Sequence, residues 1–333
     1  MSDIEIENQP SHNVAGAPLK SHRLGAMQLH DGTPNHNNRT SFRASSTHQT
    51  VADRLGALKD LPGFWQGTGF SLIARPNFSG GNKNKIFLEL NLLQETVEFT
   101  TIGSPVFNRG SLQDDIAIYG LTYLHRVTDA VTGGALHIEP GLWLNIPPTT
   151  KPQADVTVAR LATIPHGNAV CTVGFVQEVP MDGNSQPDIP PANTVPFKIG
   201  EQPPPAGTKN PFEEYDLSKP NSFRTNSLPA GITQAYIDDP NQMVRDALKG
   251  QHIMHITRLI TTTAGSNGPG VNNIPFITEN ANSLSLESVF AIETIQDASG
   301  SEFLQMQYSQ TALINFCGMS FPHVTVGTLM KAF

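Results

Sequence analysis

The sequence predicts an all-β protein, built as a single closed antiparallel β-barrel of about ten strands with a Pro-rich insertion and one or two short helices. Three observations favour this fold class. Short apolar runs rich in Val, Ile, Phe, Thr and Leu follow one another from residue 61 onward, separated by Gly, Pro and Asn clusters. Several runs alternate with the period of two that a strand requires. About ten strands joined by short turns favour closure, because a closed barrel removes exposed strand edges.

The N-terminal segment differs from the rest of the chain. Residues 1–50 are rich in Ser, Asn, Thr and His and show no apolar period. Such a segment buries too little apolar surface to offset chain entropy, so we expect a disordered or draped arm. The β-barrel domain is expected over residues 51–333, with a helical turn at 51–59. The candidate strands are 64–75, 86–91, 95–101, 116–126, 135–144, 155–164, 168–177, 251–263, 284–295, 302–315 and 322–331.

The barrel is interrupted by a Pro-rich insertion at 178–250. Residues 180–240 hold 12 of the 26 prolines, and each proline removes a donor from a strand ladder. We therefore expect this segment to cross the surface or the mouth of the barrel. Its end predicts a helix over 241–249, with Asp239 as N-cap, Pro240 at the first position and Gly250 as stop. Residues 264–274 are expected to form a flexible loop.

Composition excludes several classes of function. The formal net charge is −8 and there is no Lys/Arg block, so nucleic acid is not an expected partner. No run is long enough for a membrane span and no secretory signal opens the chain, which predicts a soluble, cytoplasmic protein. Only Cys171 and Cys317 occur, which excludes a disulfide scaffold and a CxxC zinc site. Both cysteines lie in strand-like runs and are expected to be buried, inert thiols.

Familiar enzyme signatures such as GxSxG, a P-loop and HExxH are absent from the sequence, so the histidines are the more informative residues. His323 begins the last predicted strand and shares a face with Thr325 and Gly327. A flat ligand could lie against Gly327, which has no side chain, and the imidazole could bind its metal. A hydrogen-bonded surface histidine is the alternative interpretation.

Four segments in the same order resemble the nitrobindin-like heme-binding barrels. They are residues 61–69 (LPGFWQGTG), 95–108 (ETVEFTTIGSPVFN), 129–143 (DAVTGGALHIEPGLW) and 321–329 (FPHVTVGTL). The resemblance covers roughly 60–175 and 284–333. It leaves out the arm and the Pro-rich insertion, and Val324 stands where the family pattern has Leu.

The resemblance implies a heme b cofactor and a set of residues around it. His323 would be the proximal iron ligand and His137 the pocket histidine on the other side of the porphyrin. Trp65 and Trp143 would lie near the pocket or at the closing end of the barrel. A ferric heme with an open position is expected to bind nitric oxide or to isomerise peroxynitrite. If His137 or His166 stands over the iron, weak peroxidase activity is expected instead.

A second hypothesis is a heme-free, lipocalin-like barrel that binds or transforms a hydrophobic small molecule. Glu139 beside His137 could form an acid–base pair. Further candidate polar groups, whose facing the sequence leaves open, are Tyr123, Arg160 and His166.

A third hypothesis is an interaction module. Val324, Val326 and Met330 form an apolar outward face on the last strand, which predicts cover by the insertion, the arm or a second subunit. From this face we expect a homodimer.

Overall fold

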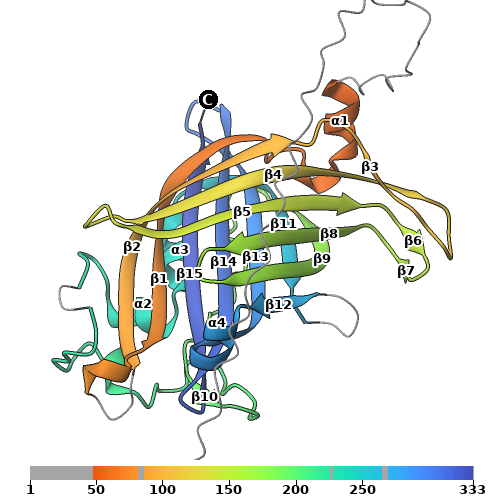
Figure 1. The fold of residues 1–333 in the computed structure, drawn as a ribbon. Coiled ribbons are helices and arrows are strands. Elements are labelled where there is room, and N and C mark those ends of the chain that lie inside the picture. The colour runs from red at the N-terminus through yellow and green to blue at the C-terminus, as the bar shows by residue number, and fades with distance from the viewer. Residues whose placement is uncertain (1–47, 82–85, 226–227, 265–268, 333) are drawn as a thin grey trace, which may run out of the picture. The chain divides into compact units, whose positions relative to one another are not determined.

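The computed structural model describes residues 48–81, 86–225, 228–264 and 269–332, and they form the predicted barrel (Figure 1). Neighbouring strands are antiparallel, and the ring closes where β15 pairs with β1. The predicted arm lies outside the described residues up to residue 47. In barrel order the ten strands are β1 (Gly63–Pro76), β2 (Ile86–Thr101), β4 (Ile116–Asp129), β5 (Ala135–Ile146), β8 (Thr157–Ile164), β9 (Asn168–Pro180), β11 (His252–Thr262), β13 (Asn282–Gln296), β14 (Glu302–Phe316) and β15 (Met319–Lys331).

The chain also forms shorter strands and short helices besides the ten barrel strands. The two candidate strands at 86–91 and 95–101 are one strand, β2. The loop prediction for 264–274 is wrong at its end, where β12 pairs with β9. The short strands are β3 (Val106–Asn108), β6 (Thr149–Thr150), β7 (Gln153–Ala154), β10 (Phe197–Lys198) and β12 (Gly270–Asn273). The helices are α1 (His48–Arg54), η1 (Gly56–Leu58), η2 (Phe78–Gly80), η3 (Glu213–Tyr215), α2 (Gln234–Asp238), α3 (Asn241–Ala247) and α4 (Pro275–Asn280).

One end of the barrel is closed by the segment before β1. Leu55, Leu58 and Leu61 are buried in one cluster with Trp65 and Trp143. The indole Nε1 of Trp65 donates a 2.7 Å hydrogen bond to the Leu61 carbonyl, which satisfies the only polar atom of that buried side chain. The two tryptophans therefore lie at the closed end, which is one of the two positions that the family resemblance implied.

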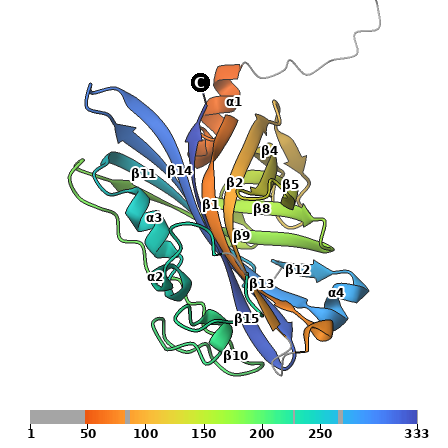
Figure 2. The same ribbon diagram turned by 90° about the vertical axis from the view of Figure 1, so that its left-hand side faces the viewer.

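The Pro-rich segment between β9 and β11 lies against the outside of the barrel wall. Figure 2 shows α2 and α3 beside β11, β14 and β15. Tyr215, Ile237 and Val244 are buried in one cluster with the outward-facing Val324 and Val326. Full burial of an aliphatic or aromatic side chain stabilises a fold by about 1.5–3 kcal/mol, so this contact holds the segment in place.

This cover changes the interpretation of the last strand. Val324 and Val326, which suggested a homodimer, are covered by the chain's own segment, whereas Met330 is 38% exposed. The homodimer itself stays a prediction.

The segment is also fixed by polar contacts. The N–H of Leu88 in β2 donates to the Phe223 carbonyl at 2.9 Å, and Thr225 N–H donates back to Leu88 at 3.0 Å. At the start of α3, the N–H of Asn241 donates to the Asp239 carboxylate at 3.1 Å. Asp239 therefore caps the helix as predicted, although α3 ends at Ala247, two residues before the predicted 249.

The prediction that both cysteines are buried is wrong, because Cys171 is only partly buried and lines the outer face of β9. Cys317 is exposed, and with Gly318 it forms the turn between β14 and β15. Both residues have positive φ, 51° and 76°, as a two-residue hairpin turn requires, so the run NFCGMS is a turn and not a strand interior. Among the described residues, none of the helices is long and apolar enough to span a membrane.

Candidate functional site

The barrel interior changes from apolar to polar along its axis. Beyond the tryptophans at the closed end lies a polar layer, which we define as Glu95, Tyr123, His125, Glu139, Arg160 and Tyr308, all buried. Beyond that layer, inward-facing residues are partly buried and line the end of the barrel opposite the tryptophans, which we call the open end. They are Ile73, Asn91, His137, Gln310, Ala312, His323 and Thr325. The alternation of each strand fixes which residues point inward, so one register places all three zones.

Glu139 is the centre of the first half of the polar layer. Its Oε1 accepts hydrogen bonds from the Tyr123 hydroxyl and from the Arg160 guanidinium, whose Nε lies 3.1 Å away. His137 Nε2 lies 3.3 Å from its other oxygen. Burial raises the pKa of Glu139, but the charge of Arg160 and the bonds from His137 and Tyr123 outweigh it and hold the pKa well below its usual range. Glu139 is therefore an ionised carboxylate at neutral pH.

Glu95 is the centre of the second half. Its Oε2 accepts from the Tyr308 hydroxyl at 2.7 Å and lies 2.7 Å from His125 Nε2. Burial, followed by the nearby Glu95 charge, raises the pKa of Tyr308 well above its usual value, so the phenol stays a donor. Each carboxylate of the layer is thus held by a tyrosine and a histidine.

Three inward-facing glycines make room for these side chains. A Cβ on Gly141 would lie 2.6 Å from the Tyr123 ring, and one on Gly69 would lie 2.3 Å from Glu95 Oε1. A Cβ on Gly327 would lie 2.4 Å from the Tyr308 ring, because Tyr308 and Gly327 are cross-strand partners. The face of Gly327 that was expected to receive a flat ligand is therefore covered by Tyr308.

His137 and His166 lie together at the open end. Their rings stack with centroids 6.0 Å apart, and His137 stands on β5 while His166 stands on the turn between β8 and β9. Burial, followed by the charge of His137, lowers the pKa of His166. The contact with Glu139 fixes Nε2 of His137 as the donor, which leaves Nδ1 as the basic nitrogen. His137 is thus an oriented acid–base group beside an ionised carboxylate.

His323 faces inward from β15, opposite Ala312 of β14. Its Nε2 lies 2.6 Å from the Ala74 carbonyl oxygen. A carbonyl only accepts, so Nε2 carries the proton and has no lone pair for a metal. Burial lowers the pKa of His323 to about 4, against the opposing effect of the Ala74 bond, so the ring is neutral at pH 7. In this geometry the residues do not fit a heme held through His323 Nε2. Among the described residues, no cluster of three or more His, Cys, Asp or Glu side chains could hold a metal ion.

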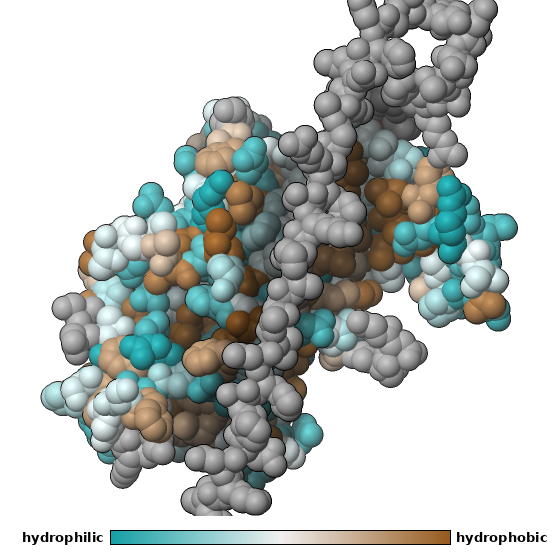
Figure 3. Space-filling model, viewed as in Figure 1, coloured by the Kyte–Doolittle hydropathy of each residue, from teal (hydrophilic) through white to brown (hydrophobic). Residues whose placement is uncertain are grey.

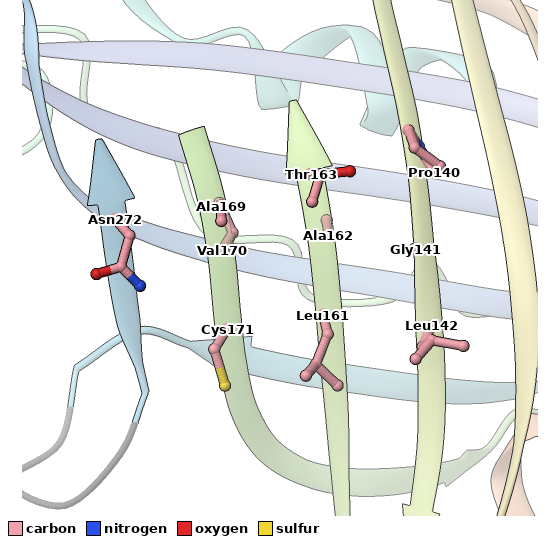
Figure 4. Close-up of a pocket in the computed structure, with 10 residues that line it drawn as sticks. All are labelled: Pro140, Gly141, Leu142, Leu161, Ala162, Thr163, Ala169, Val170, Cys171 and Asn272. Carbon is pink, nitrogen blue, oxygen red and sulfur yellow. The ribbon is translucent and has the colours of Figure 1, made fainter. Parts of the chain in front are cut away.

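An apolar groove of about 380 Å³ lies on the outer face of β5, β8, β9 and β12. Figure 4 shows Leu142, Leu161 and Cys171 on neighbouring strands, with Asn272 on β12. Figure 3 shows hydrophobic residues in the middle of the face that these strands form. The groove's lining carries no charged side chain, and Thr163, Cys171 and Asn272 are its polar residues.

The sequence interpretation singled out part of the polar layer and missed the rest. His137, Glu139, Arg160, Tyr123 and His166 were candidates, and the structure brings them together at the open end and in the layer below it. Glu95, His125 and Tyr308 were missed. The available signal was the alternation of β2, β4 and β14, which places these polar residues on the same face as buried apolar ones.

The fold and the site define a closed ten-stranded antiparallel barrel with a polar layer in its interior. No protein-family model matches the chain, and no curated protein matches it. Among solved structures, the chain is similar to the crystal structure of Rv2717c from M. tuberculosis, at 13% sequence identity and a TM-score of 0.41. The match covers 84% of this chain and 98% of that chain. So loose a similarity carries no argument about family or activity.

Proposed function

We propose that the protein binds a hydrophobic small molecule with a hydrogen-bond-accepting head, such as a carboxylic acid, in the open end of the barrel. The observation that carries this proposal is the change along the barrel interior, from a fully buried apolar end through a buried polar layer to inward-facing residues that are only partly buried. A concave site lined by apolar residues with a few polar groups is the usual form of a ligand site.

Gln310 provides the best recognition group. Its Oε1 accepts a 3.1 Å hydrogen bond from Arg160, which orients the amide and leaves its two N–H groups as donors toward the open end. Thr325, opposite Gln310 on β15, adds a hydroxyl. Ile73 and Ala312 supply the apolar wall for the body of the ligand. His137, with Glu139 as its positioning residue, is the acid–base group should the ligand be transformed.

Displacement of a fluorescent probe tests the proposal. Decanoate should displace 1-anilinonaphthalene-8-sulfonate, and Ala312→Trp, which fills the open end, should weaken decanoate binding at least tenfold. Ala298→Trp, at an exposed position in the turn between β13 and β14 at the other end of the barrel, is the matched control and should bind like the wild type. Equal affinities in Ala312→Trp and the wild type would overturn the proposal.

Heme binding with activity toward nitric oxide, peroxynitrite or peroxide is the second candidate. It is favoured by the four family-like segments and by the inward position of His323 on the last strand of a closed barrel. His323 would have to release the Ala74 carbonyl before it could bind iron. Hemin titration tests this candidate. A Soret band that is lost or shifted in His323→Ala supports it, and an unchanged spectrum removes His323 as the ligand.

A further inference from the structure

A cavity lies outside the barrel, beneath the Pro-rich segment. Its volume is about 220 Å³. The wall is formed by outward-facing residues of β11, β13 and β14, and the roof by residues 187–190 and by α3. Most of the lining is apolar and includes Ile189, Val244, Ile256 and Val289. The cavity is separate from the open end, because the two lie on opposite faces of the same strands.

Two buried amides in the lining have oxygens without a partner. Asn241 is 6% exposed and Gln307 is 2% exposed, and neither Asn241 Oδ1 nor Gln307 Oε1 has a hydrogen-bond partner within the described residues. Asn241 Nδ2 donates to the Pro190 carbonyl at 2.8 Å, and Gln307 Nε2 donates to the Val244 carbonyl at 3.1 Å. Since carbonyls only accept, both amides are fixed with their nitrogens on the Pro-rich segment. The oxygens are therefore the groups left unsatisfied, and a buried acceptor without a donor destabilises the folded state.

Glu293 adds a third acceptor to the same lining. It is 1% exposed, and its Oε2 accepts a 2.7 Å bond from Gln305. No ion pair within 4 Å joins it to a described cation. Burial raises its pKa to about 8, against the opposing effects of Gln305 and Arg258. A carboxyl so placed is neutral in the free protein at pH 7 and would be ionised by a bound cation.

Neither of the two arginines described near Glu293 forms an ion pair with its carboxyl. Arg258, on β11, donates instead to the Asp188 carbonyl at 3.0 Å and to Gln177 at 3.3 Å. Arg245, on α3, is paired with Asp239. Arg258 and Asp188 also line the cavity, and the charge of Arg258 acts on Glu293. Both arginines donate their hydrogen bonds to other partners, so Glu293, Asn241 and Gln307 remain as acceptor groups beside the apolar part of the lining.

We propose that this cavity binds a small hydrophobic primary amine as its ammonium ion, with the ammonium held by Glu293, Asn241 and Gln307. An ammonium offers three donors, which matches three acceptors. The cavity is smaller than the roughly 300–1,000 Å³ of pockets for drug-sized ligands, so it suits a molecule on the order of ten non-hydrogen atoms. Ile256 and Val289 pack against the apolar body.

Isothermal titration calorimetry tests the site with three probes that have a similar phenylalkyl body and different polar groups. The probes are 2-phenylethylamine, 2-phenylethanol and 3-phenylpropanoate. The amine should bind at least tenfold more tightly than the alcohol, and the anion should not bind. Glu293→Gln should weaken amine binding at least tenfold and leave the alcohol within twofold. Glu287→Gln, on the same strand and the same face but outside the cavity, is the matched control and should bind like the wild type.

Two further variants separate this site from the open end. Ala291→Phe fills the cavity and should abolish binding of the amine and the alcohol, with circular dichroism confirming that it folds. Ala312→Trp fills the open end and should leave amine binding unchanged. Loss of amine binding in Ala312→Trp, equal binding of amine and alcohol, or no binding of any probe would each overturn the assignment.

Discussion

Replacing Glu293 with Gln should remove a pH-dependent loss of stability. Burial raises the pKa of the Glu293 carboxyl from its ordinary 4.5 to about 8 in the folded protein. A carboxyl whose folded pKa lies above its unfolded pKa costs the folded state nothing below pH 4.5. Between pH 4.5 and 8 the unfolded chain loses this proton while the folded protein keeps it, so the fold is progressively destabilised as the pH rises toward 8. At 1.36 kcal/mol per pKa unit, full ionisation costs about 5 kcal/mol as an upper bound. Gln keeps the acceptor for the Gln305 amide but has no proton to lose.

Urea unfolding at pH 6, 7, 8 and 9 measures this effect. The wild type should lose about 2–3 kcal/mol of unfolding free energy between pH 6 and pH 9 relative to Glu293→Gln, so the two curves of unfolding free energy against pH should diverge. Glu287 is exposed on the same face of β13, so the unfolding free energy of Glu287→Gln should change with pH as that of the wild type does. Every other titrating group is common to all three proteins and cancels in the differences. Parallel curves for the wild type and Glu293→Gln would refute the assignment of Glu293 as a buried, uncompensated carboxyl.

Two further predictions concern the polar layer. Arg160→Met should destabilise the protein by about 3–5 kcal/mol in urea unfolding, because Glu139 is then a buried charge without its cation. Adding Glu139→Gln should recover part of the loss, and a double variant no more stable than Arg160→Met alone would contradict this. Gly327→Ala should cost about 1–3 kcal/mol, because its Cβ would meet the Tyr308 ring at 2.4 Å. Gly270→Ala is the control, with open space around its Cβ, and an equal effect of both changes would count against close packing at Gly327.

The strands could be predicted because alternation and turn residues mark them locally. The predictions are wrong where the local sequence pattern does not match the surroundings that the fold gives to those residues. Residues 92–94 break the alternation of β2 because Leu92 packs against the cluster under the Pro-rich segment while Leu93 is buried on the inward face. A strand covered on both sides is apolar on both faces and loses its period of two. Conversely, β12 has the sequence GVNN, which has little strand propensity, and forms through its ladder with β9.

The sequence could predict which types of residue form the candidate site, but it could not predict which of them come into contact. Glu139 and His137 are two residues apart, so one strand places them on one face. Glu95 and Tyr308 are separated by 213 residues and meet over β1 and β15, the two strands between β2 and β14, where Gly69 and Gly327 have no side chains. Gly327 was correctly placed on the inward face with His323. The occupant of the space beside it, Tyr308, comes from the neighbouring strand and is set by register.

Because the Pro-rich segment covers part of the barrel wall, the same strands line both the barrel interior and the cavity beneath that segment. On β14, Tyr308 points inward to Glu95, while Gln307 points outward to the Val244 carbonyl of α3. A barrel exposed to water would carry a hydrated polar residue at position 307. Here the segment removes that water and leaves the Gln307 oxygen unsatisfied. The cost is inherent in covering a strand whose outward residues are partly polar, and it is relieved by a ligand that donates hydrogen bonds beneath the segment. Because successive residues of the strand face opposite ways, substitutions at 291 and 312 perturb one compartment at a time, and each proposed site can fail without the other.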